Sequence, residues 1–130
     1  MEYGYRIKGT GPFAEVLQKT REELAKEGFG ILTEIDVKAT LKKKLNVDFD
    51  NYVILGACNP PFAYQALQAE REIGLLLPCN VIVYEIDGEV YVSAIVSTIA
   101  MSMVDNDKLS DIAIQVEVKL RDAVDNIATV

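Results

Sequence analysis

The chain has 130 residues, of which 50% are hydrophobic and 25% charged, a composition that predicts one globular domain spanning residues 1–130. Twenty acidic residues outweigh thirteen basic ones, and the net charge of −7 repels phosphate backbones and anionic lipid surfaces, so we expect no nucleic-acid and no membrane partner. Histidine is absent, which excludes His-dependent catalytic triads and His-ligated metal sites, and we expect no metal and no other cofactor.

The cellular location follows from segments that the sequence lacks. Its N-terminus shows no basic stretch followed by an apolar one, as a signal peptide would. The longest uncharged apolar run, residues 90–104, is too short for a membrane-spanning helix. Two cysteines are too few for a disulfide scaffold, so we expect a cytoplasmic protein with reduced thiols.

The chain begins with a predicted strand and helix. Alternation of apolar with polar or small residues over 3–8 is typical of a half-buried strand. Pro12 then fits the first turn of a helix, and apolar residues recur at helical spacing after it. We expect this helix to end at Gly28 in a left-handed cap.

A second strand and a short helix follow. Residues 29–37 alternate as a strand does, and apolar residues spaced by four predict a helix up to Leu45 with Asp36 as its N-cap. Three lysines, residues 42–44, lie at the end of this helix, where its dipole favours positive charge. We interpret them as a solvated face, with an anion site as the alternative.

The third strand, residues 52–57, is apolar without alternation, which predicts a central strand covered on both faces. After Cys58, we expect Asn59 to cap a helix that carries two prolines in its first turn. This turn brings a thiol and a carboxamide together.

A second cysteine turn precedes a hairpin. The segment 74–80 ends in Pro78, Cys79 and Asn80 and leads into a strand at 81–86. The dipeptide Asp87-Gly88 tolerates the positive φ angles of a two-residue primed turn, so a fifth strand, with residues 90–95 alternating, should pair with the fourth.

A short helix is expected within residues 97–104, and residues 105–107 resemble a cap for the last long helix. That helix should lie across the sheet and cover one face of it. Two aliphatic residues, Ile114 and Val118, lie off its apolar stripe and, together with the run 99–104, suggest self-association as a homodimer. The stripe itself consists of Leu109, Ile112, Ala113, Val116, Leu120, Ala123, Val124 and Ile127.

The runs 54–61 and 74–80, together with residues 28–29 and 34–37, resemble the domain of unknown function family 302 over nearly the whole chain. The resemblance implies an α+β fold, with helices on one face of a curved, mainly antiparallel sheet of about five strands. Its plan is β-α-β4-α, like that of the TATA-box-binding protein, with short helices inserted between strands. The resemblance also suggests a homodimer and brings no established activity. Val96-Ser97 stands where the family has an Asp-Pro pair, so no role for that carboxylate carries over.

If the strands run up and down, the two cysteine turns meet at one edge of the sheet. We therefore predict a ligand site there, lined by residues 75–77, Phe29 and the thiols and carboxamides of both turns. Gly28 and Ser97 should lie at the same edge. The site residues that we select are Cys58, Asn59, Cys79, Asn80 and Phe29.

A second, polar set belongs at the opposite edge: Glu34, Asp36 and Lys42. A plain structural interpretation exists for each group. A buried cysteine behaves as a small hydrophobic residue, and Asn-Pro turns occur for reasons of backbone geometry. In this interpretation, Asp36 is an N-cap, and Glu34 forms an ion pair with a lysine on the neighbouring helix. Two carboxylates fall short of the oxygen ligands that calcium prefers.

Three functions remain open. The first is a small-ligand-binding module rather than an enzyme, with its pocket at the Cys58 and Cys79 edge and a small molecule as its partner. The second is a protein that uses a thiolate for sulfur transfer, soft-metal binding or redox chemistry. The third is a structural homodimer without a ligand. The residues do not identify a substrate.

Overall fold

The structure is a computed structural model that describes residues 2–128. Strands and helices follow one another in the order β1 (Gly4–Lys8), α1 (Phe13–Lys26), β2 (Gly30–Asp36), α2 (Val37–Leu45), β3 (Tyr52–Cys58), α3 (Pro60–Ala69), the 3-10 helix η1 (Arg71–Leu76), β4 (Cys79–Ile86), β5 (Glu89–Ile95), α4 (Ser97–Ala100) and α5 (Asp107–Ala128).

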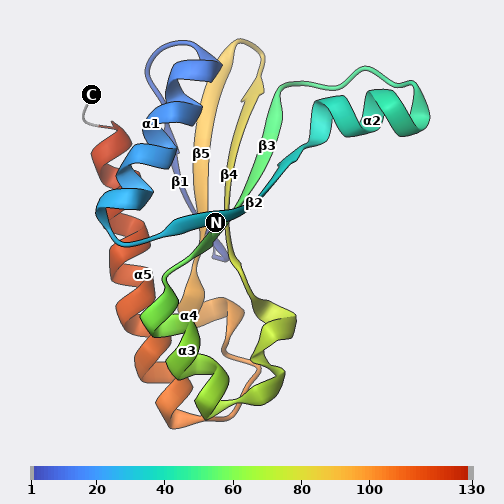
Figure 1. Cartoon of the computed structure of the whole chain (residues 1–130). Coiled ribbons are helices and arrows are strands. Elements are labelled where there is room, and N and C mark those ends of the chain that lie inside the picture. Colours follow the sequence, from blue (N-terminus) through green and yellow to red (C-terminus); the bar gives the residue numbers. More distant parts are fainter. Residues whose placement is uncertain (1, 129–130) are drawn as a thin grey trace.

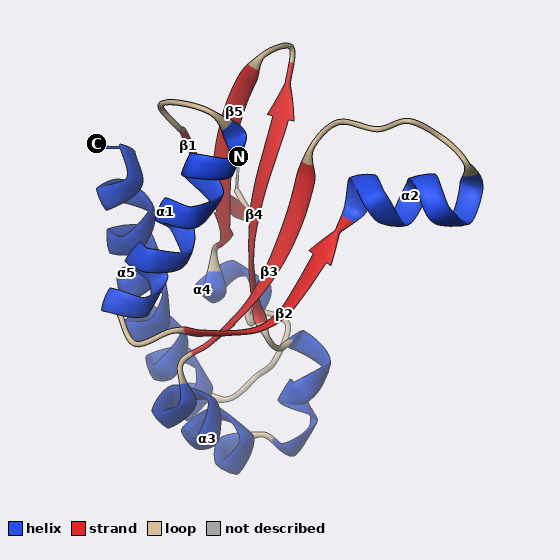
Figure 2. Ribbon diagram, turned by 45° about the horizontal axis from the view of Figure 1, so that its top comes forward, coloured by secondary structure: helices blue, strands red, loops and turns tan. Residues whose placement is uncertain are grey.

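The five strands form one sheet in the order β1-β5-β4-β3-β2, and every neighbouring pair is antiparallel. Helices α1 and α5 lie side by side on one face of this sheet (Figures 1 and 2). The predicted α+β fold is confirmed, and α2, α3, η1 and α4 are the segments inserted into the β-α-β4-α plan.

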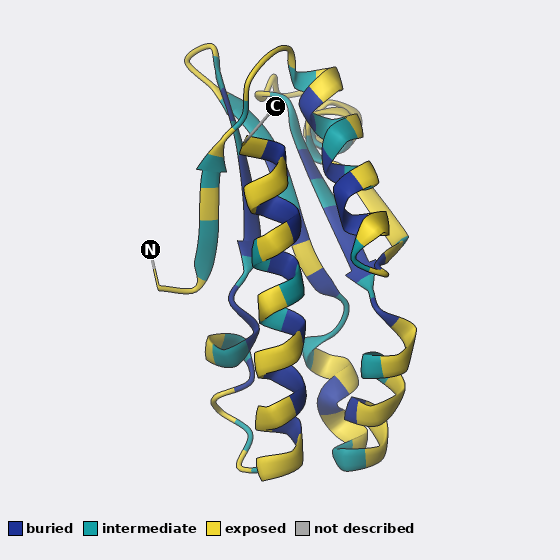
Figure 3. Cartoon of the chain, turned by 90° about the vertical axis from the view of Figure 1, so that its left-hand side faces the viewer, coloured by how far each residue is buried: buried dark blue, intermediate teal, exposed yellow. Residues whose placement is uncertain are grey.

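Helix α5 covers the sheet with the predicted stripe. The buried residues of α5 are the same eight that its spacing selects, while its outer side faces solvent (Figure 3). They pack with Val16 and Leu24 of α1 and with the inward residues of the inner strands into one core. Burying each large aliphatic side chain stabilises the fold by about 1.5–3 kcal/mol, so this stripe holds the helix layer on the sheet.

Two predicted turns are confirmed. Gly28 has φ +87°, and hydrogen bonds of 3.0 Å join Gly28 N–H to the Ala25 carbonyl and Phe29 N–H to the Leu24 carbonyl, which ends α1 in a Schellman motif. Asp87 and Gly88 have φ of 52° and 80°, as a primed turn between β4 and β5 requires.

Strand β3 differs from its prediction in one respect. It is an inner strand, as expected, between β2 and β4. Within the described chain, however, helices cover only the face that carries Val53 and Leu55, and Tyr52 and Ile54 on the other face stay half-buried. An unbroken apolar run therefore indicates an inner strand without indicating how completely each of its faces is covered.

The connection between β2 and β3 projects from the sheet on the side away from α1 and α5 (Figures 1 and 2). We call residues 37–51 the arm. Its helix α2 is capped as predicted, because the Asp36 side chain accepts a 2.9 Å hydrogen bond from Ala39 N–H. None of the nine residues of α2, all within the described chain, is buried.

The remaining differences concern element boundaries. β4 begins at Cys79, two residues before the predicted start, because Cys79 pairs with Ala57 of β3. The segment that precedes Leu77 forms a 3-10 helix. The predicted cap of the last helix is confirmed, since the Asn106 side chain accepts hydrogen bonds from the N–H groups of Lys108 and Leu109.

Candidate functional site

The two cysteine turns meet at one edge of the sheet. In the register of β3 and β4, Ala57 is opposite Cys79, and on the other side Cys58 is opposite Gly30 of β2. Cys58 is therefore one residue beyond the partner of Cys79, which places their Cα atoms about 6 Å apart by strand geometry. Both cysteines are free and line the same cavity.

This cavity has a volume of about 310 Å³ and lies between the sheet, α3 and α5. Its walls are almost entirely apolar, and five small residues, four alanines and Gly74, leave the space that larger side chains would fill. The lining consists of Phe29, Leu32, Ala57, Cys58, Asn59, Phe62, Ala63, Ala66, Leu67, Gly74, Leu77, Pro78, Cys79, Met101, Ile112, Ala113 and Val116.

The cavity runs from the core to the surface. Phe29 and Ala66 are buried in its wall, whereas Leu32 is 67% exposed and Leu67 is 38% exposed at its rim. A molecule entering between β2 and α3 would thus meet an apolar surface along its whole path. Among the described residues, no carboxylate and no basic side chain lines it.

Asn59 supports the wall of the cavity instead of capping α3. Its side chain makes no cap hydrogen bond, so that prediction is wrong. Pro60 and Pro61 have no N–H, which removes two of the donors that a cap would satisfy. The Asn59 Nδ2 donates instead to the Glu27 carbonyl at 3.2 Å, and this bond ties the start of α3 to the end of α1 beside Gly28.

Cys79 is only 8% exposed, and its surroundings favour the neutral thiol. Burial raises the pKa of Cys79, and the nearby Cys58 raises it further, whereas the Ser97 hydroxyl beside it acts in the opposite direction. The Ser97 Oγ is buried and, among the described residues, lacks a hydrogen-bond partner, so its contact with the Cys79 sulfur is weaker than a full hydrogen bond. Cys79 is therefore protonated at neutral pH.

Cys58 is the more accessible thiol. It is half-buried at the end of β3, and Asn59 separates it from the two prolines that begin α3. Since both cysteines line one cavity, a molecule bound there lies beside the half-buried Cys58 and the buried Cys79.

Of the other predicted site residues, some line the cavity and some do not. Phe29 is buried in the cavity wall, as expected. Asn80 is exposed, because consecutive residues of β4 alternate between the faces, and it borders a separate hollow with Ile95 and Leu75. Leu75 itself is exposed and does not line the cavity, whereas Leu77 does.

The three residues of the polar set do not gather into one site. Glu34 pairs with Arg21 of α1, Asp36 caps α2, and Lys42 pairs with Asp48 at 3.2 Å. Exposed ion pairs of this kind contribute little to stability, roughly 0–1 kcal/mol. Each of the three has a local structural role in this fold.

Sequence reasoning missed the contribution of α5 and of Met101. Ile112, Ala113 and Val116 line the cavity from the helix layer, and Met101 lies next to them after α4. The available signal was the small size of Ala63, Ala66 and Ala113 on helix faces that point inward.

Residues 2–128 hold no group of three or more Cys, Asp and Glu side chains arranged to bind a metal ion. The helices in this range are also too short or too polar to span a lipid bilayer.

Fold and site together define an α+β protein that keeps an apolar cavity, bordered by two thiols, between its helices and the edge of an antiparallel sheet. The chain belongs to the family described as domain of unknown function DUF302, whose model matches residues 5–127. A solved structure described as the uncharacterized conserved protein DUF302 from Bacillus stearothermophilus is similar, with 29% identity and a TM-score of 0.91 over 98% of this chain and 99% of that chain. No curated protein matches.

Proposed function

We propose that this protein is a small-molecule-binding module that holds an uncharged, largely apolar ligand in the cavity between β3, α3 and α5. The observation that carries the proposal is the cavity itself, with about 310 Å³ of space and apolar walls. Small-molecule sites in proteins are mostly apolar clefts of roughly 300–1,000 Å³ with a few polar groups that orient the ligand. The proposal involves no metal, cofactor or catalytic step.

The polar groups at the wall indicate the ligand class. Because charged side chains are absent from the described lining, a charged ligand would lose its hydration without gaining a partner. The two sulfurs are soft and polarizable, which suits an aromatic or sulfur-containing molecule. The buried, protonated Cys79 argues for binding in place of thiolate chemistry at that residue.

A fluorescence titration tests the proposal. N-phenyl-1-naphthylamine is a neutral apolar probe that brightens when it leaves water, and it should bind the wild-type protein saturably. Ala63→Phe places a ring in the cavity and should weaken binding at least tenfold. Ala14→Phe, at an exposed position of α1, makes the same change away from the cavity and should leave affinity unchanged.

Native mass spectrometry of freshly purified protein adds a second readout. Extra mass that is released by heating and matches a metabolite would support the binding module. A covalent sulfur adduct on cysteine would contradict it and favour thiol chemistry. Equal probe affinity in wild-type and Ala63→Phe protein would also contradict binding in this cavity.

We also propose that the protein is a cytoplasmic homodimer. Two free thiols support a reducing compartment. The arm helix without buried residues, together with the exposed apolar residues Leu45 and Phe49, supports association with a second chain.

A further inference from the structure

We propose that a second copy of this chain docks on the sheet face opposite α1 and α5 and is held there by the arm. This inference is independent of the cavity ligand and rests on the proposed homodimer, to which it assigns a surface. Three observations support it: a sheet face that no helix of the described chain covers, a helix without a fully buried residue, and opposite net charges on the arm and the rest of the chain.

The sheet face opposite α1 and α5 carries two rows of aromatic and aliphatic residues, and the Arg6 guanidinium of β1 lies 5.0 Å from the centre of the Tyr91 ring at its margin. Tyr52, Tyr84 and Tyr91 are opposite one another on β3, β4 and β5, and their neighbouring rings stack with centroids 5.5 Å apart. In the next row, Ile54 is opposite Ile82 of β4 and Ile35 of β2. We call these six residues the open-face patch. Tyrosine-rich apolar patches of this kind are typical of protein interfaces.

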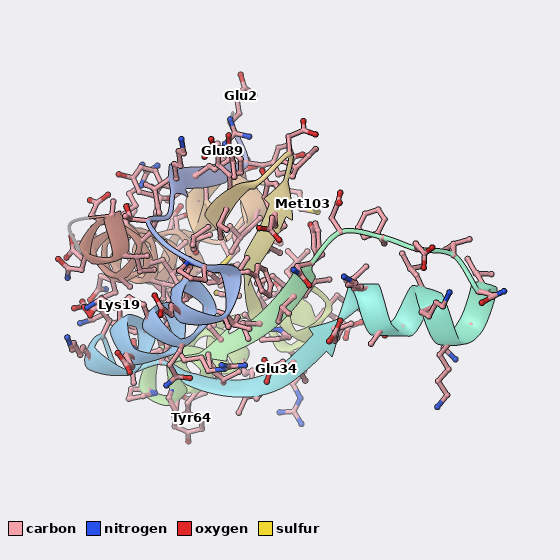
Figure 4. All side chains as sticks on the ribbon, turned by 90° about the horizontal axis from the view of Figure 1, so that it is seen from above. Glu2, Lys19, Glu34, Tyr64, Glu89 and Met103 are labelled. Carbon is pink, nitrogen blue, oxygen red and sulfur yellow. The ribbon has the colours of Figure 1, made fainter. Side chains whose placement is uncertain are left out.

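The arm extends this patch beyond the sheet. Phe49 of the arm packs near Tyr52, with ring centroids 6.2 Å apart, and Leu45, Val47 and Phe49 are exposed. Figure 4, which views the chain from above, shows α2 standing clear of the sheet on the side away from α1 and α5. An isolated helix of nine residues is marginal in water, and the exposed Leu45 leaves apolar surface of α2 that a second chain can cover.

Charge identifies the second copy as the occupant. The arm carries four lysines and two aspartates, Asp48 and Asp50, a charge of +2. The rest of the chain then has nine basic and eighteen acidic residues, a charge of −9. The arm of one copy is therefore attracted to the body of another, and two-fold symmetry makes that attraction reciprocal.

The outer side of α5 is the competing surface. Ile114 and Val118 are 54% and 55% exposed there, but they are two aliphatic residues on a helix whose stripe is already buried. The open-face patch and the apolar arm residues Leu45, Val47 and Phe49 bring together nine aromatic and aliphatic residues, so we assign the dimer to them.

Sedimentation velocity with paired variants tests this assignment. Wild-type protein should sediment at twice the 14.4 kDa chain mass at micromolar concentration. Leu45→Asp with Phe49→Asp alters exposed residues of the arm and should yield monomer. Ile114→Asp with Val118→Asp introduces the same two charges on α5 and should remain dimeric. A monomeric wild type, a dimeric arm variant or a monomeric α5 variant would each overturn the proposal.

Charge reversal tests the electrostatic part. Lys38→Glu, Lys43→Glu and Lys44→Glu together should raise the dimer dissociation constant at least tenfold at low salt, and wild-type dissociation should increase with salt. Unchanged dissociation in both measurements would refute the role of charge in docking. N-phenyl-1-naphthylamine affinity should be the same in all arm variants, so a failure of this surface and a failure of the cavity proposal are distinguishable.

Discussion

Helices α5 and α2 both have apolar residues at helical spacing, yet they differ in how far the fold buries those residues. α5 buries eight residues on the sheet and closes the core, whereas α2 stands on the arm and buries none of its nine. The comparison shows that an amphipathic pattern identifies a helix without identifying what covers it. The covered half of the molecule contains the cavity, and the uncovered half presents the arm and the open-face patch.

The largest expected difference lies in the energetics of the two helices. Leu120→Ala in α5 should lower the free energy of unfolding by about 2–5 kcal/mol, because it removes a fully buried side chain. Leu45→Ala in α2 should cost at most about 0.5 kcal/mol in dilute protein. Urea unfolding at low and high protein concentration measures both. If the loss of unfolding free energy caused by Leu45→Ala increases with protein concentration, Leu45 is buried between chains. A loss in dilute protein as large as that caused by Leu120→Ala would contradict the difference between the two helices.

A second contrast concerns Gly56 of β3, which is buried against Thr33 and Pro78. An added Cβ there would overlap Thr33 Oγ1 and approach Pro78 Cγ to 2.8 Å. Gly56→Ala should therefore destabilise the fold by about 1–3 kcal/mol through overpacking. Gly74→Ala, where an added Cβ meets nothing within 4 Å, is the matched control for a thermal melt. Equal melting temperatures for the two variants would contradict this account.

Removal of the α2 cap should act on the arm alone. Asp36→Ala deletes the acceptor for Ala39 N–H and should cost about 0.5–2 kcal/mol of helix stability. Amide hydrogen exchange should become faster within residues 37–45 and stay unchanged in α5. Asp50→Ala, in the loop after α2, serves as the control. Unaltered exchange in α2 would mean that Asp36 does not act as its cap.

The smallest effect distinguishes the two thiols on the covered side. Iodoacetamide should label Cys58 faster than Cys79 in native protein, because Cys79 is buried and its pKa is raised. Labelling of Cys79 should increase mainly as pH rises above the range in which an ordinary thiol ionises. Peptide mass spectrometry gives both rates, with urea-unfolded protein as the reference. Faster labelling at Cys79 would contradict this order.

Local chemistry explains which features were predictable. The stripe of α5, the Gly28 and Asp87-Gly88 turns and the Asp36 cap depend on residues close in sequence, and each was predicted correctly. The meeting of Cys58 and Cys79 followed from strand order. The cavity could not be predicted in this way. It depends on the space between the sheet and helices α3 and α5, and the small side chains of Ala63, Ala66 and Ala113 leave that space unfilled. The predicted Asn59 cap does not form, because the Asn59 side chain donates instead to the backbone carbonyl of Glu27, a residue distant in sequence.

The central claim is that the space between β3, α3 and α5 binds a small apolar molecule. The most direct measurement is a titration of ¹⁵N-labelled protein with N-phenyl-1-naphthylamine, followed by amide chemical shifts. The account predicts saturable shifts at Phe29, Ala66 and Ala113, with Tyr84 of the open-face patch unchanged. Shifts confined to the open-face patch, or none at saturating probe, would contradict it.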